Sequence, residues 1–174
     1  MAQNPKGRVP ALSGVPGRIG GSDNLLTELH AILFYLARTH PQARLLPTDP
    51  AGEARAIEWM NWLASNVHAM SYGQIWRANR FVTDESDFAA VQNKGRKNLR
   101  EQYAYIEQLL ADQREWALPG GYSVVDPYLL LFHQWGGRVG LDMDNYPAWR
   151  RLTDRTAQRP AVQRVLEQEN ITLP

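Results

Sequence analysis

Hydrophobic residues recur at helical spacing along most of the chain. Leu25, Leu29, Ile32, Leu33 and Leu36 follow the period of an amphipathic helix and predict a helix over about residues 27–39. The same spacing predicts further helices over about residues 50–79, 86–115, 123–135, 146–158 and 160–169. The pattern therefore indicates a mainly α protein built around a helical bundle.

The first 24 residues differ from the rest because they are rich in Pro and Gly, and only Val9–Leu12 resembles a short strand. Residues 40–51 contain three prolines and are predicted to form a linker. Asp49 then caps the next helix, with Pro50 at its first position. A small strand-and-helix fragment is thus expected in front of the bundle.

Composition narrows the class of protein. The chain has 19 Lys and Arg against 18 Asp and Glu, so it lacks the one-sided charge typical of nucleic-acid binding. It contains no Cys, which excludes disulfides and fits a cytoplasmic location. Residues 1–21 show no signal peptide, and no stretch approaches the roughly 20 apolar residues of a membrane span. The four His residues lack metal-ligand spacing, so neither a metal site nor a nucleic-acid or membrane partner is expected.

Ser123 and Asp126 have the spacing of a capping box and predict the start of a helix. This motif is structural, and we expect it to contribute stability rather than chemistry. The basic run Lys94–Arg100 is followed by Glu101 and Glu107 and is predicted to be a solvated helix face.

Several motifs occur in a fixed order along the chain. They are Asn4–Leu12, Leu26–Glu28 with Ala31–Ile32 and Tyr35–Leu36, Trp59–Trp62 with His68, and Tyr122–Leu129, followed by a weaker match at Arg159–Val162. As an ordered set they resemble bacterial glutathione S-transferases, most closely the beta class. The resemblance implies the ββα half of a thioredoxin-like glutathione-binding domain at residues 1–40, a linker at 41–48 and an all-α C-terminal domain at 49–174. It also implies that the βαβ unit preceding the third strand in the family is missing from this sequence.

The resemblance assigns glutathione contacts to the fragment. It implies a cis peptide bond at Val9–Pro10, with the backbone of Val9 binding the cysteinyl part of glutathione. Thr27 and Glu28 are expected in the first helical turn, where Glu28 binds the α-amino group of the γ-glutamyl end. Leu29 stands where relatives carry a small or hydroxylated residue, which weakens this pocket. An acid that merely stabilises a helix start remains an alternative for Glu28.

Asn61 and His68 are seven residues apart, so both are expected on one face of the second helix. The resemblance implies that both reach the glutathione site, although a structural or solvated His68 stays open. Ala69 replaces a lysine of close relatives, and Arg77 and Arg80 are candidates to supply the missing cation.

The resemblance implies conjugation of the glutathione thiol to an apolar electrophile, a detoxification reaction, in a cytoplasmic homodimer. Glutathione is then a co-substrate, and no cofactor is expected. The thiol-activating Ser, Tyr or Cys of the family lies in the missing segment, so no catalytic residue is assigned in this chain. A non-catalytic module that binds glutathione or a hydrophobic ligand is therefore the alternative, and a degenerate product without function is a third. One group of aromatic residues could form a surface for the apolar ligand: Trp59, Trp62, Tyr72, Trp76 and Phe81. The alternative is that they belong to the core or to a dimer interface, and we favour this alternative for Trp59 and Trp62.

Overall fold

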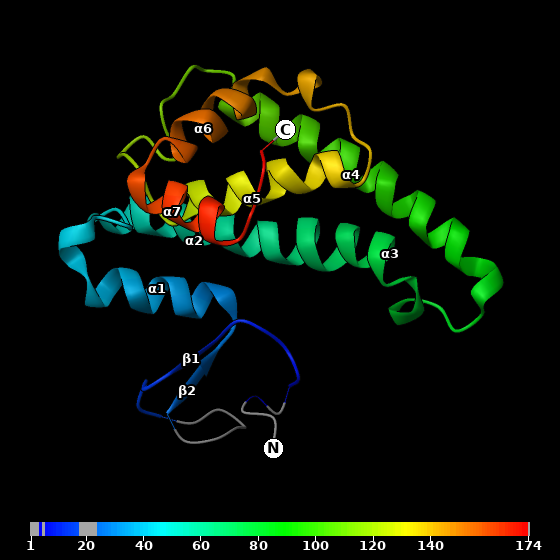
Figure 1. Ribbon diagram of the computed structural model, residues 1–174, viewed down its shortest axis with the longest axis horizontal. Helices are drawn as coiled ribbons and strands as arrows, with labels where there is room; N and C mark the ends of the chain where they lie inside the picture. The colour runs from blue at the N-terminus through cyan, green and yellow to red at the C-terminus, as the bar shows by residue number, and fades with distance from the viewer. Residues whose placement is uncertain (1–3, 5, 18–23, 174) are drawn as a thin grey trace.

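The computed structural model describes residues 4, 6–17 and 24–173. Within these residues a two-stranded antiparallel sheet precedes a set of helices. Strand β1 spans Ala11–Ser13 and strand β2 spans Leu25–Thr27, with Ala11 opposite Thr27 and Ser13 opposite Leu25. Figure 1 shows this sheet at one end of the molecule, connected to the bundle through α1.

The main helices follow in chain order. They are α1 (Leu29–Thr39), α2 (Pro50–Trp62), the π-helical segment η2 (Leu63–Tyr72), α3 (Gly73–Trp76), α4 (Phe88–Leu110), α5 (Val125–Arg138), α6 (Pro147–Ala157) and α7 (Pro160–Gln168). Short 3₁₀ turns lie at Pro41–Ala43, Ala78–Arg80, Glu85–Asp87 and Met143–Asn145. The predicted mainly α bundle with a small ββα fragment is confirmed, and each predicted helix is present. None of the described helices is both long and apolar enough to cross a membrane.

The helix starts reflect local chemistry. Asp49 caps α2 as predicted, because its side chain accepts a hydrogen bond from Gly52 N–H at 2.7 Å. Asp126 accepts the Ser123 N–H at 2.7 Å, and Ser123 Oγ accepts the Val125 N–H at 3.2 Å. Asp126 also accepts the Ala117 N–H at 2.8 Å, which ties the preceding loop to the start of α5. The predicted capping box is confirmed.

Two expectations about local structure are wrong. The first strand begins at Ala11 instead of Val9, since Val9 and Pro10 precede the residues that pair with β2. The second helix does not continue as one α-helix to residue 79, because residues 63–72 form wider π-type turns.

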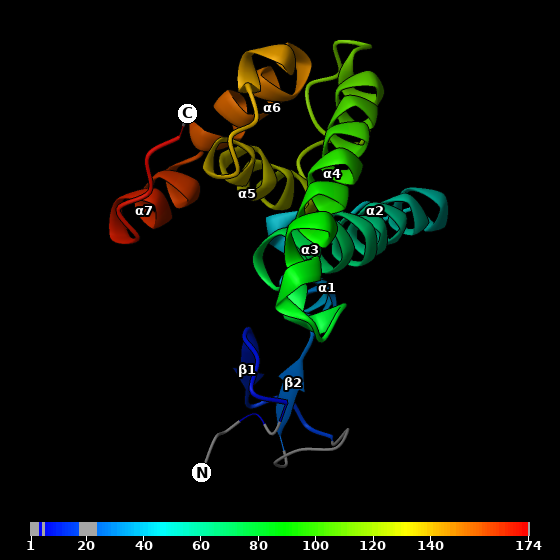
Figure 2. The same cartoon turned by 90° about the vertical axis from the view of Figure 1, so that its right-hand side faces the viewer.

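The core lies between α2, η2, α4, α5 and α6, around large side chains that are almost fully buried: Met60, Leu63, Tyr72, Leu99, Tyr103, Ile106, Phe132 and Trp149. Gly95 of α4 permits close packing against η2, because a Cβ there would lie 3.0 Å from the Ser71 carbonyl oxygen. Trp59 is only 9% exposed, as the core interpretation predicted, whereas Trp76 is 46% and Phe81 40% exposed. Viewed from the side, the sheet lies below α1 and α3 (Figure 2). The predicted site residues lie just before β1, in β2, at the β2–α1 junction, in α2 and in η2.

Candidate functional site

The junction between β2 and α1 is held by an unusual backbone conformation at Glu28. This residue has φ of 72° and ψ of 119°, a region that non-glycine residues rarely adopt. The sheet ends at Thr27 and α1 begins at Leu29, so Glu28 makes the sharp turn between them. The prediction that Thr27 lies in the first helical turn is therefore wrong, since Thr27 pairs with Ala11 in the sheet. Strained residues of this kind cluster at ligand-binding sites.

The carboxylate of Glu28 points out of the fold and is paired with Lys6. Lys6 Nζ donates to Glu28 Oε1 at 2.5 Å and to Thr27 Oγ1 at 3.0 Å. The Glu28 side chain is 70% exposed, so the pair lies open to solvent. The hydrogen bond from Lys6 and the Lys6 charge lower the pKa of Glu28. Glu28 therefore presents an ionised carboxylate that already binds one ammonium group.

The first turn of α1 adds a second polar feature beside this carboxylate. The Ile32 N–H donates to the Glu28 carbonyl at 3.1 Å, which closes the first helical turn. The Glu28 side chain does not cap the helix. The N–H groups of the first turn consequently carry the positive end of the helix dipole beside the carboxylate. One small region thus offers both an anion and a set of donors, as binding of an amino-acid head group requires.

The Val9–Pro10 peptide bond is cis, as predicted. Strand pairing sets Ala11 opposite Thr27, so Val9 and Pro10 lie at the end of β1 that approaches Glu28. Val9 is 92% exposed, so this residue lies at the surface of the molecule. The loop before it is held by Asn4, whose side chain donates to the Arg8 carbonyl at 2.5 Å.

Asn61 of α2 contacts α1 at the same junction. Its Oδ1 lies 3.2 Å from His30 Nδ1, and the His30 ring packs edge-on against Tyr128 at 5.7 Å. Burial lowers the pKa of His30, which favours the neutral ring. Asn61 thus fixes a histidine two residues after Glu28.

His68 contacts a different helix. Its ring lies 5.5 Å from Trp135 and 6.2 Å from Phe132, both on α5. Burial lowers the pKa of His68, and the charges of Arg77 and Arg8 lower it further. Asn61 thus contacts α1 whereas His68 contacts α5, and the π-type turns of η2 begin between the two residues.

Arg8 connects the two groups of predicted residues. The charge of Arg8 lowers the pKa values of Glu28 and of His68, and it also lowers that of Arg80. Sequence reasoning assigned no role to Lys6, Arg8 or His30. All three residues are close in sequence to predicted glutathione contacts, since Lys6 and Arg8 precede Val9 and His30 follows Leu29. This closeness in sequence is the one feature from which their place at the site could have been predicted.

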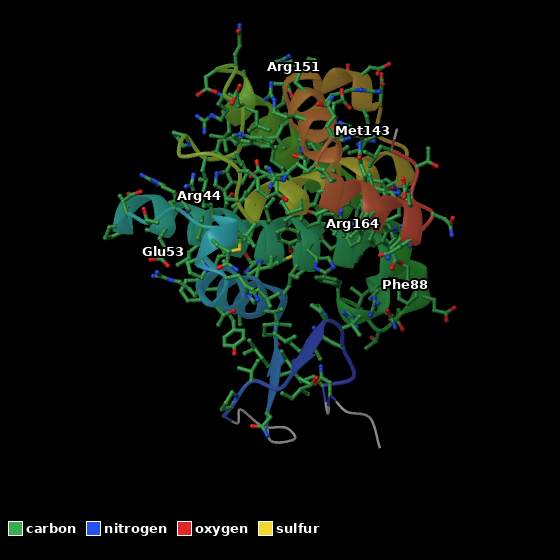
Figure 3. All side chains as sticks on the ribbon, turned by 60° about the vertical axis from the view of Figure 1, so that its left-hand side comes forward. Arg44, Glu53, Phe88, Met143, Arg151 and Arg164 are labelled. Atoms are coloured by element: carbon green, nitrogen blue, oxygen red, sulfur yellow. The ribbon has the colours of Figure 1, made fainter. Side chains whose placement is uncertain are left out.

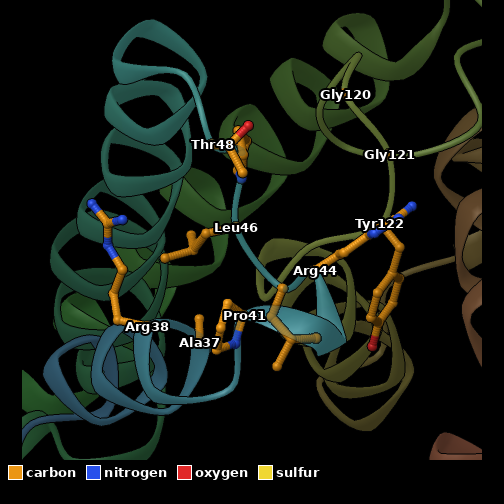
Figure 4. Close-up of a pocket in the computed structure, with 11 residues that line it drawn as sticks. Ala37, Arg38, Pro41, Arg44, Leu46, Thr48, Gly120, Gly121 and Tyr122 are labelled. Atoms are coloured by element: carbon orange, nitrogen blue, oxygen red, sulfur yellow. The ribbon is translucent and has the colours of Figure 1, made fainter.

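A separate hollow of about 480 Å³ lies at the opposite end of α1. Figure 4 shows it between the end of α1, the loop around Arg44 and Leu46, and Tyr122. Because α1 has 11 residues, this hollow is about 16 Å along the helix from Glu28. It therefore does not belong to the candidate site. Among the described residues no cluster of three His, Asp or Glu side chains is arranged to hold a metal ion.

Comparisons with known proteins agree with this geometry. The chain is 31% identical over 172 residues to glutathione S-transferase GstA of Escherichia coli O157:H7, covering 98% of this chain and 78% of that protein. A glutathione transferase homologue from Sulfitobacter, solved with bound glutathione, superimposes with a TM-score of 0.84 at 30% identity, covering 98% of this chain and 78% of the other. A beta-class glutathione S-transferase from Sphingomonas chungbukensis superimposes with a TM-score of 0.79 at 29% identity, covering 98% and 78% of the two chains. Comparison with models of protein families gives no match.

Proposed function

Because this chain belongs to the glutathione S-transferase family, with beta-class bacterial neighbours, we propose that it binds glutathione at the β2–α1 junction and transfers its thiol to an electrophile. The observation that carries the proposal is the ionised, outward-pointing carboxylate of Glu28 at the start of α1. In the proposed complex Glu28 receives the α-amino group of the γ-glutamyl residue, and the first-turn N–H groups of α1 receive its carboxylate.

The remaining predicted residues complete the proposed glutathione site. The backbone of Val9, beside Pro10, pairs with the cysteinyl part of glutathione. Thr27 and Asn61 support the γ-glutamyl end from β2 and α2, because Thr27 holds Lys6 and Asn61 holds His30. His68, whose ring lies next to Trp135, is proposed to reach glutathione from η2.

The proposed reaction begins with the glutathione thiolate, because the thiolate is the reactive form and a free thiol has a pKa of about 8.5. The positive end of α1 and the charge of Arg8 both favour the thiolate. A carbon–sulfur bond forms at the electrophilic carbon, the leaving group departs with its electron pair, and the thiol proton passes to solvent. We assign no catalytic residue in this chain.

The test is glutathione binding measured by titration calorimetry for the wild-type chain and for Glu28→Gln. Losing the charge-assisted hydrogen bond should weaken the affinity about tenfold. Glu58→Gln is the matched control, since Glu58 is an exposed acid on α2 that pairs with Arg55. Equal affinities of Glu28→Gln and the wild type would show that Glu28 does not bind the ligand.

Turnover separates the enzyme from a non-catalytic binding module. Conjugation of glutathione to 1-chloro-2,4-dinitrobenzene is followed by the absorbance of the product. Glutathione binding without measurable turnover would favour the binding module.

We further propose a cytoplasmic homodimer in which residues 1–40 bind glutathione and residues 49–174 form the electrophile side and the dimer contact. Trp62 of α2 and Tyr105 of α4 support the dimer, because their rings pack edge-on at 5.6 Å and Tyr105 remains 50% exposed. Exposed aromatic side chains such as Tyr105 are enriched at protein–protein contacts.

A further inference from the structure

The hollow of about 480 Å³ at the end of α1 lies between two segments that are bonded to each other. One wall is the linker from α1 to α2, and the other is the loop that precedes α5. The Val124 N–H, directly before α5, donates to the Leu45 carbonyl of the linker at 2.9 Å and so holds the two walls together. The volume is within the range of roughly 300–1,000 Å³ that is typical of pockets for small molecules.

Much of the surface inside this hollow is apolar. Ala37 at the end of α1 is 5% exposed. Leu45 and Leu46 of the linker also line the hollow and are half-buried against the core. Pro41 and Pro47 extend the same surface. An apolar body placed here would lose contact with water, which favours its binding.

Arginine side chains give the hollow a positive charge. Among the described residues that line it, Arg38 and Arg44 are basic and none is acidic. Arg38 Nη2 lies 2.7 Å from Glu53 Oε1, so this guanidinium already has a carboxylate partner. Within the part of the chain that the structure describes, no carboxylate forms an ion pair with Arg44. Arg44 can therefore bind an anionic group that a ligand brings.

The backbone fixes the point from which the Arg44 side chain extends. Arg44 has φ of 49° and ψ of 46°, a left-handed conformation that non-glycine residues rarely adopt. Its N–H donates to the Pro41 carbonyl at 3.1 Å and closes the 3₁₀ turn. In the view of Figure 4 the Arg44 side chain extends toward Tyr122, whereas Arg38 lies on the other side of Leu46. The cation and the apolar surface thus border the same hollow.

The wall formed by Tyr122 carries a further cation. The guanidinium carbon of Arg159 lies 3.6 Å from the centroid of the Tyr122 ring, within the range of a cation–π contact. Burial raises the pKa of Tyr122, so its hydroxyl stays neutral and adds no negative charge. The charges at this wall therefore also favour an anion.

We propose that the hollow binds a small aliphatic carboxylate, with its carboxylate group on Arg44 and its apolar chain against Leu45 and Leu46. This class of ligand follows from the lining, because an uncompensated guanidinium borders an apolar surface. The site is separate from the proposed glutathione site, since about 16 Å along α1 lies between the hollow and Glu28. Its occupation therefore does not depend on glutathione.

The first experiment tests the charge of the ligand. The chain, with and without saturating glutathione, is titrated calorimetrically with octanoate and with octanamide, which have the same length and differ in charge. We expect the wild type to bind octanoate about fivefold more tightly than octanamide. Arg44→Gln should bind octanoate as weakly as octanamide and leave the affinity for octanamide unchanged.

Two further variants control this result. Arg164→Gln removes an exposed arginine on α7 and should bind both compounds as the wild type does; Figure 3 labels both Arg44 and Arg164. Arg44→Lys keeps the charge and should restore most of the preference for octanoate. Thermal melting followed by circular dichroism confirms that each variant is folded. A preference for octanoate that Arg44→Gln retains in full would refute the assignment of Arg44.

The apolar part of the site is tested on the wild type with carboxylates of different length. Affinity should rise from acetate to butanoate to octanoate, by up to about fourfold for each methylene group that becomes buried. Equal affinities of the three acids would overturn the proposal, because an exposed arginine alone binds every carboxylate alike.

Amide chemical shifts locate the ligand. In ¹⁵N-labelled protein saturated with glutathione, octanoate should shift the amide signals of Leu46, Gly120 and Gly121, which line the hollow. Competition between octanoate and glutathione would overturn the proposal, because octanoate would then occupy the glutathione site.

The same measurements separate this inference from the proposed function. Equal binding of octanoate and octanamide by the wild type would refute the carboxylate site, and glutathione binding would still stand. A preference for octanoate that depends on Arg44, in a chain that does not bind glutathione, would support the carboxylate site and refute the proposed function alone.

Discussion

Lys6 Nζ lies 2.5 Å from Glu28 Oε1. The ammonium group of Lys6 therefore binds the same carboxylate that we propose to bind the α-amino group of glutathione. The two residues are far apart in the chain and are joined because Thr27 pairs with Ala11 across the sheet. In the free protein Lys6 therefore competes with the proposed ligand for Glu28.

Removing this competitor should strengthen glutathione binding. We expect Lys6→Met to raise the affinity for glutathione by up to about fivefold, since exposed ion pairs contribute up to about 1 kcal/mol. Titration calorimetry measures the effect, with Lys97→Met on the outer face of α4 as the control. Weaker binding by Lys6→Met would mean that Lys6 contacts glutathione itself.

The proposed dimer contact is tested by placing a charge on it. We expect the wild type to sediment with twice the mass of the 19.8 kDa chain and Tyr105→Glu to sediment as a monomer, because a buried unpaired carboxylate opposes association. Val165→Glu introduces the same charge at a 52% exposed position on α7 and should leave the mass unchanged. A monomeric wild type in analytical ultracentrifugation would refute the dimer.

Asp126 should be among the most stabilising polar residues. It is fully buried and accepts hydrogen bonds from Ala117 N–H and from Ser123 N–H and Oγ. Asp126→Ala leaves these buried donors unpaired and should lower the free energy of unfolding by about 3 kcal/mol. Ser123→Ala should cost about 1 kcal/mol.

Urea denaturation measures both changes, and Asp142→Ala provides the comparison because Asp142 caps an exposed turn. A loss for Asp126→Ala no greater than that for Asp142→Ala would contradict the structural role of the capping box.

His133 should make stability depend on pH. His133 lies on α5, is 1% exposed and packs against Trp149 of α6. Burial, and to a smaller extent the charge of Arg150, lowers its pKa to about 4. In the unfolded chain this histidine has an ordinary pKa near 6.5 and therefore binds a proton more readily than in the folded protein. The free energy of unfolding is therefore highest above about pH 6.5 and falls as the pH is lowered toward 4. The decline amounts to roughly 3 kcal/mol.

His133→Phe removes this contribution and should flatten the pH dependence of the unfolding free energy between pH 4 and 6.5. Thermal melts of both proteins at several pH values provide the measurement. His40→Phe is the control, because His40 is exposed. Parallel pH profiles for His133→Phe and the wild type would contradict the assignment.

Local patterns in the sequence determined much of this structure. The apolar spacing predicted every main helix, Asp49 with Pro50 predicted the start of α2, and the Ser123–Asp126 spacing predicted the start of α5. These features depend on residues within a few positions of one another, which is why the pattern sufficed. Resemblance to the family added the cis bond at Val9–Pro10.

Only the tertiary structure decided which distant residues meet. Strand register brings Lys6 to Glu28, and the strained backbone of Glu28 moves Thr27 from the expected helix into the sheet. The π-type turns of η2 separate the surroundings of Asn61 from those of His68, and packing of α3 on α5 brings Trp76 to Trp135 beside Arg77. Such contacts arise from packing between elements, and linear spacing does not encode them because it records only the neighbours along one helix or strand.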